Sequence, residues 1–191
     1  MNKIEQGAEL LLQGLAELGL DLSDPNFTDT PKRVAKAYQE IFSGLIDVDK
    51  QITNILQSSF PANNKCDEMI ISVNNLIYSM CPHHLLPVEY LIDIAYIPSD
   101  KGYVLGISKL SRIAEILAKR PVLQETLTTD IGKAIERVNP RGVAVKVKGN
   151  HFCVRMRGVK KQSSIITSYT SGSFRNNPAT RNEFFELTRG N

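Results

Sequence analysis

The chain has 191 residues, of which 42% are hydrophobic, and this size is typical of one globular domain with a sizeable core. A formal net charge of +3 is too small to indicate nucleic-acid binding by itself, and no apolar run is long enough to span a membrane. Three cysteines, an odd number, do not form a disulfide framework. We therefore expect a reduced, cytoplasmic protein without a signal peptide.

The first 60 residues predict an N-terminal helical segment ahead of the main domain, residues 61–191. Apolar residues recur at helical spacing over residues 4–18, which indicates a packing helix. Gly19 follows as a glycine in the left-handed conformation, the usual way for a helix to end.

A second helix is predicted to start with Thr30 as its N-cap and Pro31 as its first residue, and to end before Gly44. Arg33 then lies in the first turn, where its side chain and the helix amides could both meet an anion. An arginine at such a position is by default a surface charge, so the pattern alone leaves both interpretations open.

The pattern changes to strands at residue 68. Apolar runs over residues 69–73 and 76–78 predict one strand, and alternation over residues 90–96 predicts a second, antiparallel to the first because the connection is short. A helix with Ser108 as its cap follows and is interrupted at Pro121. Another helix then runs until Asn139.

Alternating valines from Val143 predict a third strand that continues through His151 and Cys153, which would then face the same side. Residues 164–169 predict a fourth strand, and residues 178–189 a closing helix.

This order of elements predicts an α+β fold, an antiparallel four-stranded sheet with its helices on one face. Such a sheet leaves two edges whose backbone groups must be paired or protected. We therefore expect the chain to oligomerise through its sheet edges.

Each of the three histidines lies close to a cysteine in the sequence. Cys81 and His84 form a C-x-x-H pair that one loop could present, and Cys153 is a plausible third ligand. Zinc accepts these nitrogen and sulfur donors, and three protein ligands leave its fourth position for water, as in catalytic sites. His151 would stand beside such a metal as a proton donor or acceptor. Cys66, in a polar segment, is read as incidental.

The histidines and the basic residues each allow a second interpretation. Histidines in a loop shaped by Pro82 are often no more than exposed polar residues, and spacing alone does not decide between the two. The basic residues between Lys146 and Lys161 could be a nucleic-acid patch, but they lack interleaved aromatic residues for base stacking. We therefore expect neither nucleic acid nor a membrane as a partner.

Taken together, the motifs resemble those of GTP cyclohydrolase I, and the resemblance runs over nearly the whole chain. The matching stretches occur in the family's order: DTPKRV at 29–34, MC at 80–81, HHLLP at 83–87, AYIP at 95–98, GISKLSRI at 106–113, QE at 124–125, HFCVRMRG at 151–158, and TS at 167–168 with Gly172 and Phe174. Each stretch is weak alone, but the ordered set is specific.

The resemblance implies the tunnelling fold, in which subunits join their sheets into a barrel and two pentamers stack into a homodecamer. It implies a zinc enzyme that opens the guanine imidazole ring of GTP, releases formate and forms 7,8-dihydroneopterin triphosphate. It also implies sites at subunit interfaces. The product would supply pterin or tetrahydrofolate synthesis and one-carbon metabolism.

Carried over residue by residue, the resemblance implies roles for twelve side chains. The zinc ligands would be Cys81, His84 and Cys153, and the proton-transfer residues His151 and His83. Ser108 and Gln124 match residues near the reacting groups. Glu125 matches the carboxylate that reads the N–H donors of guanine, a natural task for an acceptor-only group. The residues that match the cations of the triphosphate site are Arg33, Lys109, Arg112 and Arg157.

The sequence departs from the family pattern at four positions. Pro82 replaces a glutamate beside the proposed metal ligands, which removes a carboxylate and stiffens the loop. Tyr90 and Asp93 stand where many members have glycine and histidine, and Thr126 replaces a frequent arginine.

The sequence leaves three alternatives to a cyclohydrolase. A weakened paralogue that binds a purine nucleotide as a sensor or scaffold has Pro82 as its main support. Nitrile-reductase relatives share the fold, but their acid-and-lysine signature is not evident here. A purely structural zinc would predict unfolding on chelation.

Overall fold

The computed structural model describes residues 2–61, 66–100 and 103–190. It divides into two compact units, Met1–Ser43 and Gly44–Asn191. Helix α3 (Val48–Leu56) belongs to the second unit and packs on α4 (Ser108–Ala118). The helical segment predicted over residues 1–60 therefore includes the start of the second unit, because α3 buries Ile52 in that unit's core.

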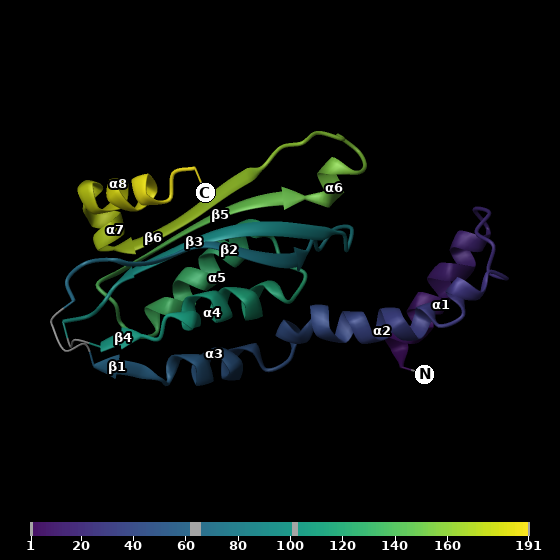
Figure 1. The fold of residues 1–191 in the computed structure, drawn as a ribbon, viewed down its shortest axis with the longest axis horizontal. Helices are drawn as coiled ribbons and strands as arrows, with labels where there is room; N and C mark the ends of the chain where they lie inside the picture. Colours follow the sequence, from purple (N-terminus) through teal and green to yellow (C-terminus); the bar gives the residue numbers. More distant parts are fainter. Residues whose placement is uncertain (1, 62–65, 101–102, 191) are drawn as a thin grey trace. The chain divides into compact units, whose positions relative to one another are not determined.

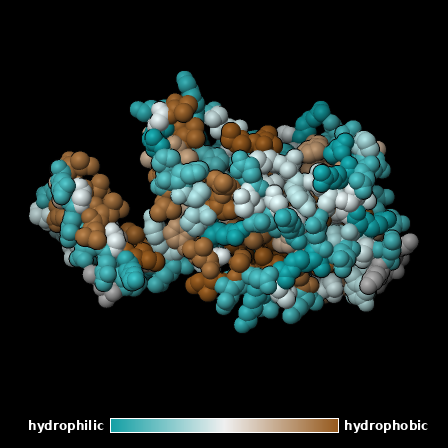
Figure 2. Space-filling model, turned by 180° about the vertical axis from the view of Figure 1, so that it is seen from behind, coloured by the Kyte–Doolittle hydropathy of each residue, from teal (hydrophilic) through white to brown (hydrophobic). Residues whose placement is uncertain are grey.

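The first unit is a pair of helices that pack on each other, α1 (Lys3–Ala16) and α2 (Thr30–Ile41), with a short 3-10 turn η1 (Pro25–Phe27) between them. Gly19 has a φ of +102°, as its expected left-handed position requires. The N-cap of α2 is Asp29, one residue before the predicted Thr30. Figure 2 shows hydrophobic side chains gathered on this unit, and Leu10, Leu11 and Leu18 are exposed.

The second unit is built on a four-stranded antiparallel sheet (Figure 1). Its strands pair in the order β2 (Ile70–Met80), β3 (Pro87–Ile97), β5 (Gly142–His151) and β6 (Ile165–Gly172). The two apolar runs predicted at the start of the sheet are one strand, because an irregularity between Ser72 and Asn75 interrupts the alternation without ending β2. The predicted antiparallel sheet and the pairing of its first two strands are confirmed.

Several short elements lie outside the predicted set. A 3-10 turn, η2 (Ser43–Leu45), precedes α3, and a separate two-stranded sheet joins β1 (Ser59–Pro61) to β4 (Tyr103–Leu105). Runs of three residues are too short to show a period in the sequence.

The main core lies between one face of the sheet and helices α4 and α5 (Gln124–Glu136). Even-numbered residues of β3 and odd-numbered residues of β5 face these helices, because side chains alternate along a strand. The fully buried members from these two strands are Val88, Tyr90, Ile92, Ile94, Tyr96, Val143, Val145 and Val147.

The helices do not all lie on one face, so that part of the fold prediction is wrong. Helices α7 (Ser173–Asn176) and α8 (Pro178–Leu187) pack on the opposite face (Figure 1). There Phe174 and Phe184 cover Ala95, Ile97 and Ala144 in a second, smaller core. The small alanine side chains leave room for the two aromatic rings, a fit that hydrophobic alternation alone does not reveal.

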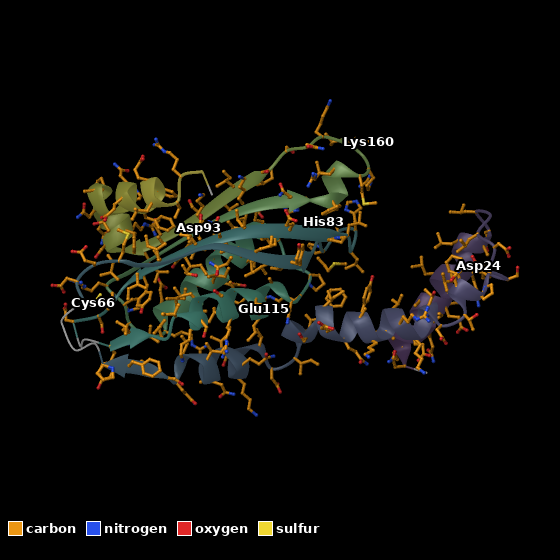
Figure 3. The ribbon with its side chains drawn as sticks, viewed as in Figure 1. Asp24, Cys66, His83, Asp93, Glu115 and Lys160 are labelled. Carbon is orange, nitrogen blue, oxygen red and sulfur yellow. The ribbon has the colours of Figure 1, made fainter. Side chains whose placement is uncertain are left out.

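A buried ion pair lies on the same face as α8. The ammonium of Lys146 donates to Asp93 Oδ2 at 3.1 Å and to the Thr188 carbonyl at 2.5 Å. The other oxygen of Asp93 accepts from the Asn74 amide at 2.9 Å. Figure 3 shows Asp93 along the sheet, away from its His83 end. Among the described residues, no helix is both long and apolar enough to cross a membrane.

Candidate metal centre

The loop between β2 and β3 presents two of the predicted ligands. Two backbone hydrogen bonds close this loop, from the Cys81 amide to the Leu86 carbonyl and from the Leu85 amide to the Cys81 carbonyl, both at 2.9 Å. Cys81 is buried and His84 is exposed. The loop therefore places a sulfur at the edge of the core and an imidazole toward solvent.

Cys153 reaches this loop from the far end of the domain through strand pairing. His151, the last residue of β5, pairs with Val88 near the start of β3. The strand does not continue through Cys153 as predicted, because the chain turns into a short helix, α6 (Phe152–Arg155). The prediction that His151 and Cys153 share a strand face is therefore wrong. The helical turn instead places Cys153 near Cys81.

The three predicted ligands form one cluster of metal donors. The donor atoms of Cys81, His84 and Cys153 all lie within 4.8 Å of one another. A tetrahedral zinc ion needs its donors about 3.5–4 Å apart, given Zn–S and Zn–N distances of about 2.3 and 2.0 Å. Two thiols and one imidazole therefore suit zinc in both chemistry and spacing. Cys66 is not part of this cluster.

Burial raises the pKa of the Cys153 thiol, and a hydrogen bond that this thiol donates to the neighbouring Cys81 adds to the effect. Two adjacent thiols do not readily ionise together without a cation nearby, because the two negative charges would repel each other. A bound divalent metal would remove that repulsion.

The His84 side chain contacts the guanidinium of Arg157. Arg157 Nη1 lies 2.6 Å from His84 Nε2. A guanidinium only donates hydrogen bonds, so this ring nitrogen is the acceptor of the pair. His83, its exposed neighbour, has Nδ1 3.7 Å from the Cys81 sulfur. Figure 3 shows His83 at the end of the sheet where the β2–β3 loop lies.

A cavity of about 330 Å³ adjoins the cluster. It is lined by six of the predicted site residues, contributed by the β2–β3 loop, the start of α5, the end of β5 and α6. The residues that line it are Cys81, Pro82, His83, Val122, Leu123, Gln124, Glu125, His151, Cys153, Val154 and Ile165.

The segment that leads into α5 is hydrogen-bonded to the end of β2. The Ser79 hydroxyl donates to the Arg120 carbonyl at 3.2 Å, and the Val122 amide donates to the Met80 carbonyl at 3.3 Å. These bonds fix the connection between α4 and α5 next to the end of β2. They carry Gln124 and Glu125, the first residues of α5, into the cavity wall.

Gln124 is a buried side chain that orients His151. Its amide nitrogen lies within 3.1 Å of three acceptors, the carbonyls of Val147 and Ile165 and the hydroxyl of Thr167. Its oxygen is therefore directed to His151 Nε2, 2.9 Å away, and that nitrogen must carry the proton. Burial lowers the pKa of His151, and the opposing charge of Glu125 is the smaller influence.

The predicted triphosphate cations are not all gathered at this cavity. Arg157 contacts His84, but Lys109 donates to the Ile55 carbonyl in α3 and is nearly buried. Burial, with a smaller contribution from the charge of Arg112, lowers the pKa of Lys109. Arg33 lies in the first unit, where its Nη2 is 3.6 Å from Asp29.

Ser108 is not the cap of its helix. The N-cap position of α4 belongs to Ile107, and Ser108 is the first helical residue, with an exposed side chain. Neither Ser108, Lys109 nor Arg112 is among the described residues that line the cavity.

Tyr90 also lies in this region, although the sequence did not predict it as a site residue. Alternation along its strand already placed it on the inward face, but nothing local indicated which groups it would meet. Its ring lies edge-on to His151, with centroids 5.9 Å apart. Burial strongly raises the pKa of its hydroxyl, and the charges of Cys81, Glu125 and Cys153 add to the effect.

Comparison with known proteins identifies the family of this chain. The family model described as GTP cyclohydrolase I matches residues 7–189. A protein named GTP cyclohydrolase 1 from Carboxydothermus hydrogenoformans is 44% identical over 97% of this chain and 93% of its own length. Proteins of the same name from Pseudoalteromonas translucida and Corynebacterium glutamicum (strain R) are 43% and 39% identical, over 99% and 97% of this chain and 99% and 93% of their own lengths. The chain therefore belongs to the GTP cyclohydrolase I family.

Proposed function

We propose that this enzyme is a zinc-dependent GTP cyclohydrolase I that hydrolyses the imidazole ring of GTP, releases formate and forms 7,8-dihydroneopterin triphosphate. The observation that carries the proposal is that one cavity is lined by the two cysteines of the donor cluster and by the oriented pair of His151 and Gln124. Family membership supports the substrate and the reaction.

Cys81, His84 and Cys153 would hold the zinc. When bound, zinc activates water by lowering its pKa toward neutrality, which supplies the nucleophile for carbon 8 of the guanine. If the metal uses His84 Nε2, Arg157 must leave that nitrogen, and its guanidinium then becomes available to a phosphate group.

His151 is proposed to protonate the imidazole nitrogen as the ring opens. It is suited to this role because it lies at the cavity wall and Gln124 fixes its orientation by accepting a hydrogen bond from Nε2. Nδ1 would then be the nitrogen that takes up a proton and delivers it to the substrate. His83, next to the Cys81 sulfur, is proposed as a second acid or base.

Glu125 is proposed to bind the guanine. It lies in the cavity wall one residue after Gln124, at the start of α5. An ionised carboxylate accepts hydrogen bonds only, so it pairs well with the amino and ring N–H donors of guanine.

We propose that the remaining predicted residues act in a site that more than one subunit completes. They are Arg33, Ser108, Lys109 and Arg112. Strands β2 and β6 are the edges of the sheet and are free to pair with other copies. We propose that they join in a tunnelling-fold barrel and a cytoplasmic homodecamer. Cations from separate segments would then meet the triphosphate, with Ser108 near the ribose.

Pro82 favours a second candidate, a paralogue that binds a purine nucleotide without completing the reaction. It lines the cavity beside Cys81, at the position where the family usually carries glutamate. The loss of a carboxylate there removes one possible proton acceptor from the site.

The deciding experiment follows formate and pterin together after GTP is added to the zinc-loaded protein, with a chelated control. Both signals rising only with metal would support the cyclohydrolase. Formate without pterin would mean that ring opening is intact and rearrangement fails. Neither signal, with GTP still bound, would favour the nucleotide-binding paralogue and make Pro82→Glu the next variant.

A further inference from the structure

Tyr90 is a fully buried side chain next to the metal donors. It lies on β3 between Ile77 of β2 and Gly149 of β5, and its side chain faces α5. None of its surface is exposed. It belongs to the same core cluster as Cys81.

The hydroxyl of Tyr90 has no hydrogen-bond partner among the described residues. Leaving a buried polar group unpaired costs about 1–3 kcal/mol. Two other tyrosines of this domain do have partners: Tyr96 accepts from the Leu105 amide at 2.8 Å, and Tyr169 donates to Glu136 at 2.9 Å. The unpaired group is therefore the one beside the candidate metal centre.

The fold makes room for the Tyr90 ring at this place. A Cβ atom on Gly149, its cross-strand neighbour, would lie 2.8 Å from Tyr90 Cε1 and 2.3 Å from Gln124 Oε1. Any side chain there would push the ring or the amide away. Glycine at this position thus allows Tyr90 and the Gln124–His151 pair to lie side by side.

The surroundings of the Tyr90 hydroxyl favour its role as a hydrogen-bond donor. The charged groups that act on it are Cys81, Glu125 and Cys153, all negative when ionised. In these surroundings the phenol keeps its proton. The missing partner is therefore an acceptor that carries negative charge.

The position of Tyr90 argues against a ligand in the cavity as that acceptor. Tyr90 is buried and is not among the described residues that line the cavity, whereas both cysteines are. Cys81, Glu125 and Cys153 are the groups shared by the cavity wall and the surroundings of the phenol. Glu125 is exposed to solvent, whereas Cys81 is buried in the same core cluster as Tyr90 and Cys153 packs against that cluster, so the sulfurs are the acceptors that share the buried surroundings of the hydroxyl. A thiolate is a better acceptor than a thiol, and metal binding deprotonates thiols.

We propose that Tyr90 is a positioning residue of the metal centre, whose hydroxyl donates a hydrogen bond to the Cys81 thiolate when the site holds its metal. The inference rests on the proposed function, since it requires that Cys81 bind a metal as a thiolate. Outer hydrogen bonds of this kind orient a ligand and tune its donor strength.

The test compares Tyr90→Phe with the wild-type protein, loaded with Co²⁺ in place of zinc. We expect the thiolate-to-cobalt charge-transfer band to move to lower energy, because a thiolate that loses a hydrogen bond gives up electrons more easily. We also expect metal affinity, measured by competition with a chelator, to fall about tenfold.

Tyr96→Phe is the matched control. It removes a hydroxyl from the same strand and the same face, but one whose partner is the Leu105 amide. We expect this variant to keep the wild-type cobalt band and metal affinity. In the metal-free state it should lose stability, whereas Tyr90→Phe should not, because only Tyr96 has a protein partner to lose.

Three outcomes would overturn the role of Tyr90. An unchanged band and affinity in Tyr90→Phe would show that the hydroxyl does not reach a metal-bound thiolate. A loss of metal-free stability in that variant would show that its partner is a protein group instead. Wild-type protein that binds cobalt without a thiolate band, or not at all, would overturn the metal site itself. Because this last result is seen before any substitution, the two failures are distinguishable.

Discussion

The sheet carries two polar clusters that are built in opposite ways. The pair of Asp93 and Lys146 is buried, and each partner has a further hydrogen bond, to the Asn74 amide and the Thr188 carbonyl. The cluster of Cys81, His84 and Cys153 lies at the end of the same sheet, partly exposed, with two thiols side by side.

The difference between the clusters indicates that the first contributes to stability and the second to function. In the first cluster opposite charges neutralise each other, so it needs nothing from outside the chain. In the second, two thiols converge and would repel each other when ionised, so a cation would complete the cluster. Each prediction below would break one of the two clusters or sharpen the contrast between them.

The largest effect is expected from Cys153→Ala. Removing one of three metal donors should abolish zinc binding, and GTP turnover should fall at least ~10³-fold because the activated water is lost. Metal analysis of the purified protein and a formate assay would measure both. Cys66→Ala, which removes a thiol outside the cluster, should leave both unchanged. Full zinc occupancy in Cys153→Ala would remove this residue from the ligand set.

His151→Ala tests the proton donor beside the cluster without touching a ligand. We expect normal zinc content and a loss of about 10²–10⁴-fold in the cyclised product, which is the usual contribution of general acid–base catalysis. Pterin fluorescence would measure the product. Undiminished fluorescence would contradict the role assigned to His151.

Lys146→Met should break the first cluster by leaving Asp93 buried and unpaired as a charge. We expect a loss of about 3–5 kcal/mol in the free energy of unfolding, measured by urea denaturation at fixed protein concentration. Zinc affinity of the folded protein should be unchanged, because the pair lies on the other face of the sheet.

The double variant Asp93→Asn with Lys146→Met is the control for that prediction. It removes both charges and keeps an acceptor for the Asn74 amide. We expect most of the lost stability to return, because no charge is then left buried without its partner. A double variant as unstable as the single one would mean that Lys146 acts through packing.

The smallest effect is expected from Arg137→Ala. Its guanidinium pairs with Asp49 at 2.9 Å, but the Asp49 side chain is 86% exposed, whereas that of Asp93 is 2% exposed. Solvent screens such a pair, so its loss should cost less than about 1 kcal/mol. A cost near that of Lys146→Met would remove burial as the reason for the difference between the two pairs.

Local patterns predicted most elements of the second unit. Alternation and helical periodicity placed the four strands of the main sheet and helices α4, α5 and α8 in their observed order, because a residue's face depends only on its neighbours in sequence. The same patterns missed α3 and the pair of β1 and β4. They also extended β5 through Cys153, because two alternating residues do not reveal that the chain turns into α6.

Placement on the correct face required tertiary packing. Phe174 and Phe184 lie against alanines on the face opposite α4 and α5, although nothing in their own periodicity distinguishes one face of the sheet from the other. Lys109 illustrates the same limit for a single charge. The family resemblance implied that this residue binds the triphosphate, but in this structure its ammonium meets the Ile55 carbonyl of α3.

The sequence by itself determined which side chains could bind a metal and transfer protons, because those properties belong to residue types and to the short spacing of Cys81 and His84. Tertiary structure alone decided that Cys153 joins them and that Gln124 orients His151. The pairing of Val88 with His151 and the packing of α5 on β5 bring these groups together. Such contacts depend on strand register and helix packing between distant segments, which no local period encodes.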